Sequence, residues 1–355
     1  MNQPSNGPYS WRFVEPGKPL EWVEGAARAP GAGEVLIEVA GCGLCHTDLG
    51  FFGGEVKTVA ELPLVLGHEI SGRVLEAGEG AGEWTGKDVL VAAVIPCGHC
   101  DMCTSGRGNV CTNQMLPGNG FDGGFASHVT VPANGLSALH NVPDEYDIAD
   151  LAVIADAVTT PLQAVRRANV SEGDFVVVVG TGGVGTYAVQ VAAATGATVV
   201  AVDIEDSRLE PLLEHGASAT VNSRGLSPRE VRDRIREHAG SLGKPRYGWK
   251  IFECSGTSAG QETAYGLLCP AATLAVVGFT RDKVSIRLSN LMAFDATAFG
   301  SWGCPPERYP EAIELVTSGR VKLLPFIRKV PMSDINTVLV EAHGGSDPRR
   351  TILVQ

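Results

Sequence analysis

The sequence lacks several features that would place it in other classes of protein. Aromatic residues make up 6% of its 355 residues and charged residues 19%, and the formal net charge is −12. That charge argues against nucleic acid or an anionic membrane surface as the main partner. No apolar run is long enough to span a bilayer, and the opening MNQPSNGPYSWRF lacks the apolar stretch of a secretory signal. We therefore expect a cytoplasmic protein that does not bind membranes.

The length of the chain, and the change in composition and apolar pattern along it, predict two domains. The first 150 residues hold short alternating runs between glycines and prolines, which are typical of β-strands and tight turns. Later, apolar strand-like segments alternate with helical ones, which indicates a parallel sheet covered on both faces. The strands are expected at 33–41, 86–96, 174–180, 198–203, 249–254, 273–279 and 349–355, and helices at 184–196 and 208–215. We predict an α/β fold, with a doubly wound parallel sheet over 158–302 and a mainly β domain over 1–157 and 303–355.

A glycine motif follows the apolar segment DFVVVVG. Gly180, Gly182 and Gly185 form G-x-G-x-x-G between a strand and a helix. There the first glycine makes the turn, the second lets the backbone approach a pyrophosphate, and the third permits close helix–strand packing. The alternative is a glycine-rich packing turn without a ligand. The residues predicted to bind the dinucleotide are Gly180, Gly182, Gly183, Val184, Gly185, Asp203 and Arg208.

The choice of dinucleotide depends on Asp203, which ends the next strand. A carboxylate there binds the ribose hydroxyls. Glu205 adds a second negative charge nearby, and both should repel a 2′-phosphate, so NAD is favoured over NADP. Arg208 is an ambiguous neighbour, because it suits either a ribose or a phosphate.

Four cysteines lie close together in CGHCDMCTSGRGNVC. Their spacing is C-x2-C-x2-C-x7-C, and four thiolates on a short loop match the closed tetrahedral coordination of structural zinc. An iron–sulfur cluster is the alternative. The nearby His99 is expected to be exposed to solvent and not to bind the metal. The predicted ligands of this structural zinc are Cys97, Cys100, Cys103 and Cys111.

A second group of metal-ligating residues lies in GCGLCHTDLG (41–50) and LGHEISG (66–72). Cys45 and His68 are candidate ligands of a catalytic zinc. Cys42 and Cys45 also form C-x-x-C, so a thiol redox pair is an alternative; otherwise Cys42 is a small buried strand residue. Asp48 and Glu69 are suited to orienting a ligating imidazole. The hydroxyl of Thr47 stands beside Cys45 and is suited to relaying a proton.

Asp156 lies in the otherwise apolar stretch LAVIADAVTTPL (151–162). A carboxylate in such surroundings needs a partner. One interpretation is a helix N-cap before a helical run through Leu162 and Arg166. The other is a metal ligand.

Together these motifs, in this order, resemble the zinc-dependent medium-chain alcohol dehydrogenases over nearly the whole chain. The resemblance implies a GroES-like catalytic domain, a Rossmann NAD domain, two zinc ions per subunit and a dimer or tetramer. It also makes Asp156 the third catalytic zinc ligand, at a position where the family often has cysteine. It assigns His46 to the cofactor pyrophosphate and Thr47 to the proton relay. Gly50 stands where many members have a histidine, so the proton leaves through water, or through the ribose and His46.

Several phrases resemble a narrower group within that family. They are VIPCGHCDMCTSGRGNVC, GGFASH, GWKIFECSG, RLSNLMAF and WGCPPERYP. The resemblance implies a small-molecule CoA-thioester substrate whose ring hydroxyl is oxidised during anaerobic degradation of aromatic acids. Another cyclic, benzylic or secondary alcohol without CoA is the alternative.

Overall fold

The computed structural model describes residues 7–25, 27–343 and 347–355. The chain forms two compact units, the first of 1–159, 303–317 and 326–355, and the second of 160–302 and 318–325. The expected boundaries differ from these mainly at 318–325. This segment joins the second unit because the Gln190 amide accepts a hydrogen bond from the backbone N–H of Lys322 (2.8 Å) and donates one to its carbonyl (3.2 Å).

The second unit contains a six-stranded parallel sheet in the order β11-β10-β9-β12-β13-β14. This parallel sheet confirms the predicted α/β class. The strand order reverses between β9 and β12, and open sheets of this kind bind ligands at the carboxyl ends of the strands beside such a reversal. The strands are β9 Phe175–Val179, β10 Thr198–Asp203, β11 Ala217–Asn222, β12 Lys250–Glu253, β13 Thr273–Val276 and β14 Thr297–Gly300.

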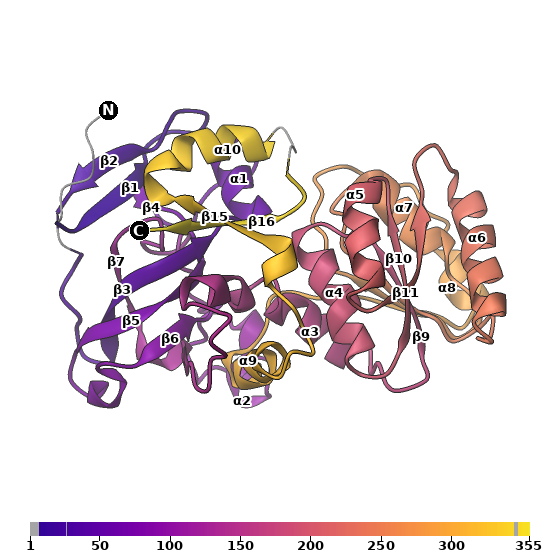
Figure 1. The fold of residues 1–355 in the computed structure, drawn as a ribbon, viewed down its shortest axis with the longest axis horizontal. Helices are drawn as coiled ribbons and strands as arrows, with labels where there is room; N and C mark the ends of the chain where they lie inside the picture. Colours follow the sequence, from indigo (N-terminus) through magenta and orange to yellow (C-terminus); the bar gives the residue numbers. More distant parts are fainter. Residues whose placement is uncertain (1–6, 26, 344–346) are drawn as a thin grey trace. The chain divides into compact units, whose positions relative to one another are not determined.

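Helices cover both faces of this sheet, with α4 and α5 on one side and α6 and α7 on the other (Figure 1). All five residues of β9 are buried, as expected of a central strand with two covered faces. The predicted helix over 208–215 is a short α-helix that passes into a 3₁₀ turn (Glu210–Leu213) containing Pro211. The α-helices are α3 Thr159–Arg167, α4 Gly183–Ala193, α5 Asp206–Leu209, α6 Pro228–Ser241, α7 Ser258–Gly266 and α8 Ser289–Ala293.

The first unit is built mainly from β-strands. Its larger sheet has the order β15-β16-β3-β5-β6-β8, with β7 paired to β3, and its smaller sheet the order β2-β1-β4. The strands are β1 Tyr9–Phe13, β2 Glu21–Glu24, β3 Glu34–Gly43, β4 Leu64–Val65, β5 Glu69–Ala77, β6 Asp88–Val91, β7 His128–Pro132, β8 Leu136–Ala138, β15 Ile327–Pro331 and β16 Arg350–Val354. The α-helices are α1 His46–Phe52, α2 Asp101–Thr104, α9 Tyr309–Thr317 and α10 Ile335–His343, and a 3₁₀ segment, η4, spans Ala149–Ala155.

The register of β3 brings distant residues together at one edge of the larger sheet. Its last residue, Gly43, is paired with Glu69 of β5 on one side and with Ile352 of β16 on the other. Cys45 therefore follows β3 at the place where His68 precedes β5. A side chain at Gly43 would lie 1.9 Å from the Glu69 carboxylate, so glycine is required there. Among the described residues, we find no helix with the length and apolarity needed to cross a bilayer.

Candidate metal and dinucleotide sites

The structure brings Cys45, His68 and Asp156 together in the first unit. Asp156 Oδ2 lies 3.7 Å from Cys45 Sγ and 3.8 Å from His68 Nε2. The three ligand atoms all lie within 4.8 Å of one another. In a tetrahedral zinc site with bonds of about 2.0–2.3 Å, the ligand atoms are separated by roughly 3.3–3.8 Å. The trio therefore fits a zinc ion with only small adjustments.

The electrostatics of the trio also favour a cation. Burial opposes protonation of His68, but the charge of Asp48 and hydrogen bonds to Asp156, Asp48 and Cys45 raise the pKa of its imidazole well above the usual value. The cluster thus attracts a positive charge to its centre. With a thiolate at Cys45 and a carboxylate at Asp156, the ligand charge of −2 balances Zn²⁺.

Asp48 fixes the geometry around two of the ligands. One of its oxygens accepts the backbone N–H of Cys45 (2.9 Å), and the other accepts that of Gly67 (3.1 Å) and lies 3.4 Å from His68 Nδ1. The carboxylate is fully buried. It is therefore placed to orient the imidazole, the arrangement expected of a carboxylate behind a metal-ligating histidine.

Glu69 acts on the other side of the cluster. It accepts the backbone N–H of Ala157 (3.1 Å) and forms two contacts with Arg350, one of them from Nε at 3.0 Å. Arg350 also lies 3.9 Å from Asp156. Glu69 and Arg350 are 0% and 6% exposed, so they form a buried ion pair that positions the Asp156 segment.

Asp156 does not act as the N-cap of a helix. It directly follows η4, and the next helix, α3, begins at Thr159. Its carboxylate points instead toward Cys45 and His68. Of the two interpretations of this residue, the geometry therefore favours the metal ligand.

Cys42 lies close to Cys45 in sequence but has a different environment. It is fully buried in β3, and burial raises the pKa of its thiol well above the usual value. Both cysteines are free thiols. A buried thiol with a raised pKa is a poor nucleophile, so the redox-pair alternative finds no support.

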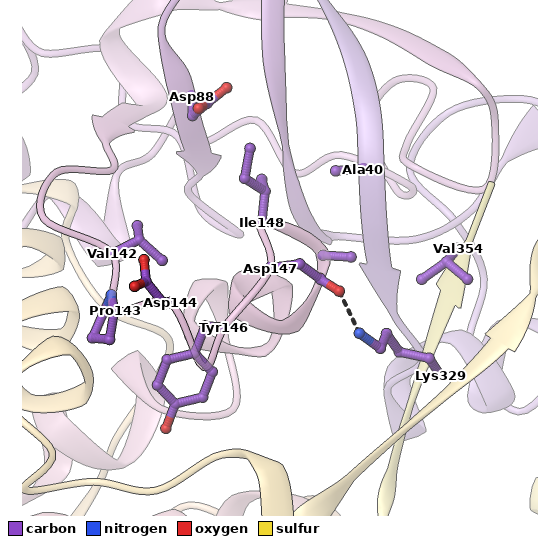
Figure 2. Close-up of a pocket in the computed structure, with 11 residues that line it drawn as sticks. Ala40, Asp88, Val142, Pro143, Asp144, Tyr146, Asp147, Ile148, Lys329 and Val354 are labelled. Atoms are coloured by element: carbon purple, nitrogen blue, oxygen red, sulfur yellow. Dashed lines mark hydrogen bonds and ion pairs between the residues drawn. The ribbon is translucent and has the colours of Figure 1, made fainter.

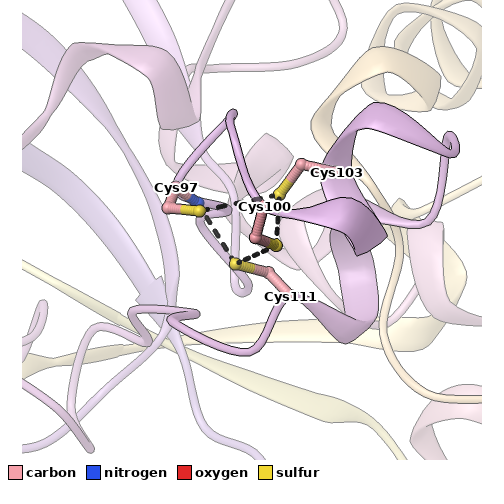
Figure 3. Close-up of side chains that lie close together, drawn as sticks. All are labelled: Cys97, Cys100, Cys103 and Cys111. Atoms are coloured by element: carbon pink, nitrogen blue, oxygen red, sulfur yellow. Dashed lines mark hydrogen bonds between the residues drawn. The ribbon is translucent and has the colours of Figure 1, made fainter.

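The four predicted structural cysteines form a compact cluster (Figure 3). The Sγ–Sγ distances are 3.4 Å for Cys100–Cys103, 3.6 Å for Cys100–Cys111 and 3.9 Å for Cys97–Cys103. Four sulfurs around one zinc ion are expected roughly 3.8 Å apart. Backbone hydrogen bonds at Cys103 and Thr112 lower the pKa of the Cys100 thiol to about 5, so one ligand is readily ionised.

We expect Cys100→Ser to remove one zinc ion per chain and to lower the melting temperature, because a closed structural site stabilises its loop. Metal analysis and thermal unfolding check this. His99→Ala is the matched control: His99 lies in the same loop and is exposed, and among the described contacts its imidazole meets only the Cys97 carbonyl. Equal zinc contents in C100S and the wild type would contradict the assignment.

The glycine loop between β9 and α4 has two sterically different glycines. A Cβ at Gly185 would lie 1.8 Å from the carbonyl oxygen of Gly180, whereas one at Gly182 would meet nothing within 4 Å. Gly182 is the N-cap of α4 and provides no side-chain cap. The open backbone N–H groups of this helix end are therefore available to a phosphate.

Asp203 ends β10 beside this loop and is buried. Its carboxylate accepts the backbone N–H (2.7 Å) and hydroxyl (3.1 Å) of Thr181, and the backbone N–H groups of Ile204 (2.8 Å) and Glu205 (3.1 Å). Arg208 lies 3.8 Å away. The carboxylate is thus held rigidly at the carboxyl end of its strand.

The first unit also contains a hollow of about 760 Å³ (Figure 2). No predicted metal ligand lines it. Lys329 is the cation in its lining, and it is already paired with Asp147 and with Asp150 (3.0 Å). Its lining also carries Asp88 and Asp144, so the hollow is unsuited to phosphate groups.

Comparison with known families identifies the class of protein. Residues 31–144 match the family "Alcohol dehydrogenase GroES-like domain", and residues 183–318 match "Zinc-binding dehydrogenase". An alcohol dehydrogenase from Geobacillus stearothermophilus is 30% identical over 341 residues, which cover 95% of this chain and 96% of that protein. The chain therefore belongs to the zinc-type medium-chain alcohol dehydrogenase family.

Solved structures agree with this assignment. A thermostable alcohol dehydrogenase from Pyrobaculum aerophilum, with cobalt and zinc bound, has a TM-score of 0.83 at 27% identity, covering 98% of this chain and 99% of that one. A zinc-binding dehydrogenase from Sinorhizobium meliloti, bound to NADP, has a TM-score of 0.85 at 26% identity, covering 99% and 100%.

Two residues of the sites were missed by the sequence analysis. Arg350 opens the last strand, and Arg224 follows β11, where it pairs with Glu205. Arg350 directly precedes the apolar run TILV, so the sequence indicated that it could be buried with the strand. A buried arginine needs a carboxylate partner. Arg224 lies 19 positions after Glu205, and local sequence does not reveal this pairing.

Proposed function

We propose that this dehydrogenase oxidises a secondary alcohol with NAD, and that the hydroxyl binds at a zinc ion held by Cys45, His68 and Asp156. The observation that carries the proposal is the geometry of these three donors. They supply three of the four positions of a tetrahedral zinc ion and leave one for substrate, as catalytic zinc sites do. The cysteine quartet is complete by itself and is assigned to structural zinc.

Zinc in the trio would supply a Lewis acid that lowers the pKa of the substrate hydroxyl. Thr47 has an exposed side chain whose hydroxyl lies 3.8 Å from Cys45 Sγ, so it is placed to accept the hydroxyl proton. His46 is exposed at the start of α1 and is assigned to the cofactor pyrophosphate. Asp48 orients His68, and Glu69 with Arg350 orients Asp156.

NAD is assigned to the glycine loop and Asp203. The loop offers open backbone N–H groups to the pyrophosphate, and the rigid carboxylate suits the ribose hydroxyls. The residues that take part in this proposal are Gly180, Gly182, Gly183, Val184, Gly185, Asp203 and Arg208.

The two glycines of this loop give a prediction that separates binding from folding. Gly182→Ala is expected to weaken NADH binding by about tenfold without changing the melting temperature, because the added methyl group meets only the approaching phosphate. Gly185→Ala is expected to destabilise the chain by roughly 1–3 kcal/mol, because it collides with Gly180. NADH fluorescence titration and thermal unfolding measure the two effects. The same change in both variants would contradict the assigned roles.

The more specific substrate is 6-hydroxycyclohex-1-ene-1-carbonyl-CoA, oxidised to the 6-oxo product in the cytoplasm during anaerobic benzoyl-CoA degradation. This part of the proposal is supported by the sequence phrases that resemble dehydrogenases of that substrate. Conjugation of the new ketone with the ring alkene favours the oxidation. The alternative is another cyclic, benzylic or secondary alcohol without CoA.

A CoA thioester requires cations for its phosphates in a chain of net charge −12. The loop after β13 provides three: Arg281, Lys283 and Arg287 are exposed and form no ion pair within the described part of the chain. The first unit offers two candidates, Lys57 and Arg73: Arg73 is paired with Asp88 at 2.9 Å, and Lys57 is exposed without an ion pair among the described residues but is a single charge. We therefore assign the CoA phosphates to the 281–287 loop.

The test is NADH formation at 340 nm with the CoA thioester, the free acid and cyclohexanol. A kcat/KM that is orders of magnitude higher for the thioester supports the CoA assignment, because binding energy from CoA is then used in the transition state. Comparable values for all three substrates would leave an alcohol dehydrogenase without CoA specificity. Arg281→Ala and Lys283→Ala should raise KM for the thioester alone.

A homo-oligomer, either a dimer or a tetramer, is part of the same proposal. The edge strand β14 and its surroundings expose several apolar side chains in the second unit, and exposed apolar patches mark interaction surfaces. They include Phe279, Leu288, Met292 and Trp302, which are 70%, 67%, 78% and 51% exposed. Light scattering of the purified protein tests this assignment.

A further inference from the structure

The segments that follow β10 and β11 lie side by side in the second unit. The two strands are parallel, with Asp203 paired in register with Asn222, and the backbone N–H of Ser223 donates to the Asp203 carbonyl (2.8 Å). Residues 204–206 and 223–224 therefore leave the sheet together, next to the carboxylate assigned to the ribose. With the ribose at Asp203, as proposed, a group at its 2′ position would lie beside both segments.

Arg224 is fixed against the segment after Asp203. Its Nε donates to the carbonyl of Ile204 (3.1 Å), and its Nη2 contacts the Glu205 carboxylate. Its own backbone N–H donates to the Asn222 side chain (2.9 Å). The guanidinium is thus held within two residues of Asp203.

The side chains of this pair are largely exposed, 60% for Arg224 and 47% for Glu205. Exposed ion pairs contribute little to folding stability. The pair matters more for the local charge than for stability. It offsets the positive charge of Arg224 with the negative charge of Glu205, two residues after Asp203. Glu205 is the second negative charge predicted beside Asp203, and the structure shows that it is paired with Arg224.

Arginine binds phosphate through paired hydrogen bonds, and an arginine near the ribose is what accommodates a 2′-phosphate in dinucleotide-binding folds. Here the neighbouring Arg208 lies 3.8 Å from Asp203, and Arg224 is occupied by Glu205. Both arginines are therefore already directed to carboxylates. A 2′-phosphate would have to displace Glu205 to reach Arg224.

We propose that Glu205 determines coenzyme selectivity by withholding Arg224 from the 2′ position of the ribose. Asp203 binds the hydroxyls of NAD, and Glu205 keeps the adjacent arginine from binding the phosphate of NADP. This inference rests on the proposed nucleotide site. It adds a specificity-determining pair, Glu205 and Arg224, to that site.

The experiment measures binding of 5′-AMP and 2′,5′-ADP by calorimetry to the full-length wild type, E205Q, R224M and E205Q/R224M. Removing Glu205 is expected to strengthen 2′,5′-ADP binding by about tenfold, the lower range for a charge-assisted contact at an exposed site. Affinity for 5′-AMP should change less than about twofold, because that ligand has no 2′-phosphate. The double variant should lose the gain.

Asp233→Asn is the matched control, because Asp233 is also an exposed carboxylate in the second unit that faces an arginine, Arg236, at 3.6 Å. It removes one negative charge without touching the ribose segment. A gain in D233N equal to that in E205Q, a gain that persists in E205Q/R224M, or no gain in E205Q would each overturn the proposal. If the wild type binds 2′,5′-ADP weakly but 5′-AMP normally, the nucleotide site stands regardless of the variants. Failure of the wild type to bind 5′-AMP would remove the nucleotide site, and this inference with it.

Discussion

Replacing Asp156 with alanine is expected to lower kcat/KM by about 10³-fold or more and to remove one zinc ion per chain. In the proposed zinc site the carboxylate would supply one of three ligands and half of the ligand charge, and Lewis-acid stabilisation amounts to several kcal/mol. Affinity for NADH should stay unchanged, because the glycine loop and Asp203 belong to the second unit. Steady-state kinetics, metal analysis and NADH titration measure the three quantities.

Two further variants show whether Asp156 acts as a ligand. Asp156→Cys restores an anionic donor and should recover zinc and much of the activity, whereas Asp156→Asn keeps the shape, loses the charge and should recover little. Because carboxylate is a harder ligand than thiolate, the cysteine variant should also hold zinc more tightly. Full zinc content and activity in D156A would show that this residue is not a ligand.

Replacing Arg350 with methionine is expected to destabilise the chain by roughly 3–5 kcal/mol, because it leaves the buried Glu69 carboxylate without its cation. Burial already raises the pKa of Glu69 against the opposing charge of Arg350. For a chain of 355 residues the melting temperature should fall by roughly 4–7 °C. Thermal unfolding of the purified variant checks this.

The neighbouring residue provides the control. Arg349 has a side chain that is 50% exposed, and it pairs with Asp347 at 3.0 Å on the surface. Arg349→Met should therefore cost no more than about 1 kcal/mol. A glutamine at position 69 in the R350M background should restore part of the stability, since the buried charge is then gone. Equal losses in R349M and R350M would show that the burial of the pair is not what matters.

The fold was predictable where local sequence determines structure. The run of four valines in β9 is apolar on both faces, which only a central parallel strand or a buried helix tolerates, and Gly180 marks its end. The helix α6 also carried a readable signal, since Ser227 and Glu230 form a capping box with Pro228 at the first turn. The end of the predicted 208–215 helix was less predictable, because Pro211 permits a 3₁₀ turn as readily as a helix.

The site residues also fall into those that local sequence predicts and those that it does not. The cysteine quartet is local in sequence, and its spacing was enough to predict the cluster. Bringing Cys45, His68 and Asp156 together requires the register of β3 with β5 and the position of η4, which no local pattern specifies. Asp156 was assigned through family resemblance for that reason. The position of Arg350 depends on the pairing of β16 with β3, two strands that lie near opposite ends of the given sequence and that no local pattern connects.

The buried contact between Glu69 and Arg350 also has a consequence for biosynthesis. A nascent chain exposes Cys45, His68 and Asp156 to the cell long before residue 350 leaves the ribosome. Until then Glu69 has no cation, and the strand that carries Arg350 cannot add to the edge of β3. The four-cysteine loop needs no such distant strand. If the cysteine quartet and the trio hold zinc as proposed, the two ions should therefore be acquired in a fixed order during translation, with the structural ion first and the catalytic ion only after residue 350 has been made.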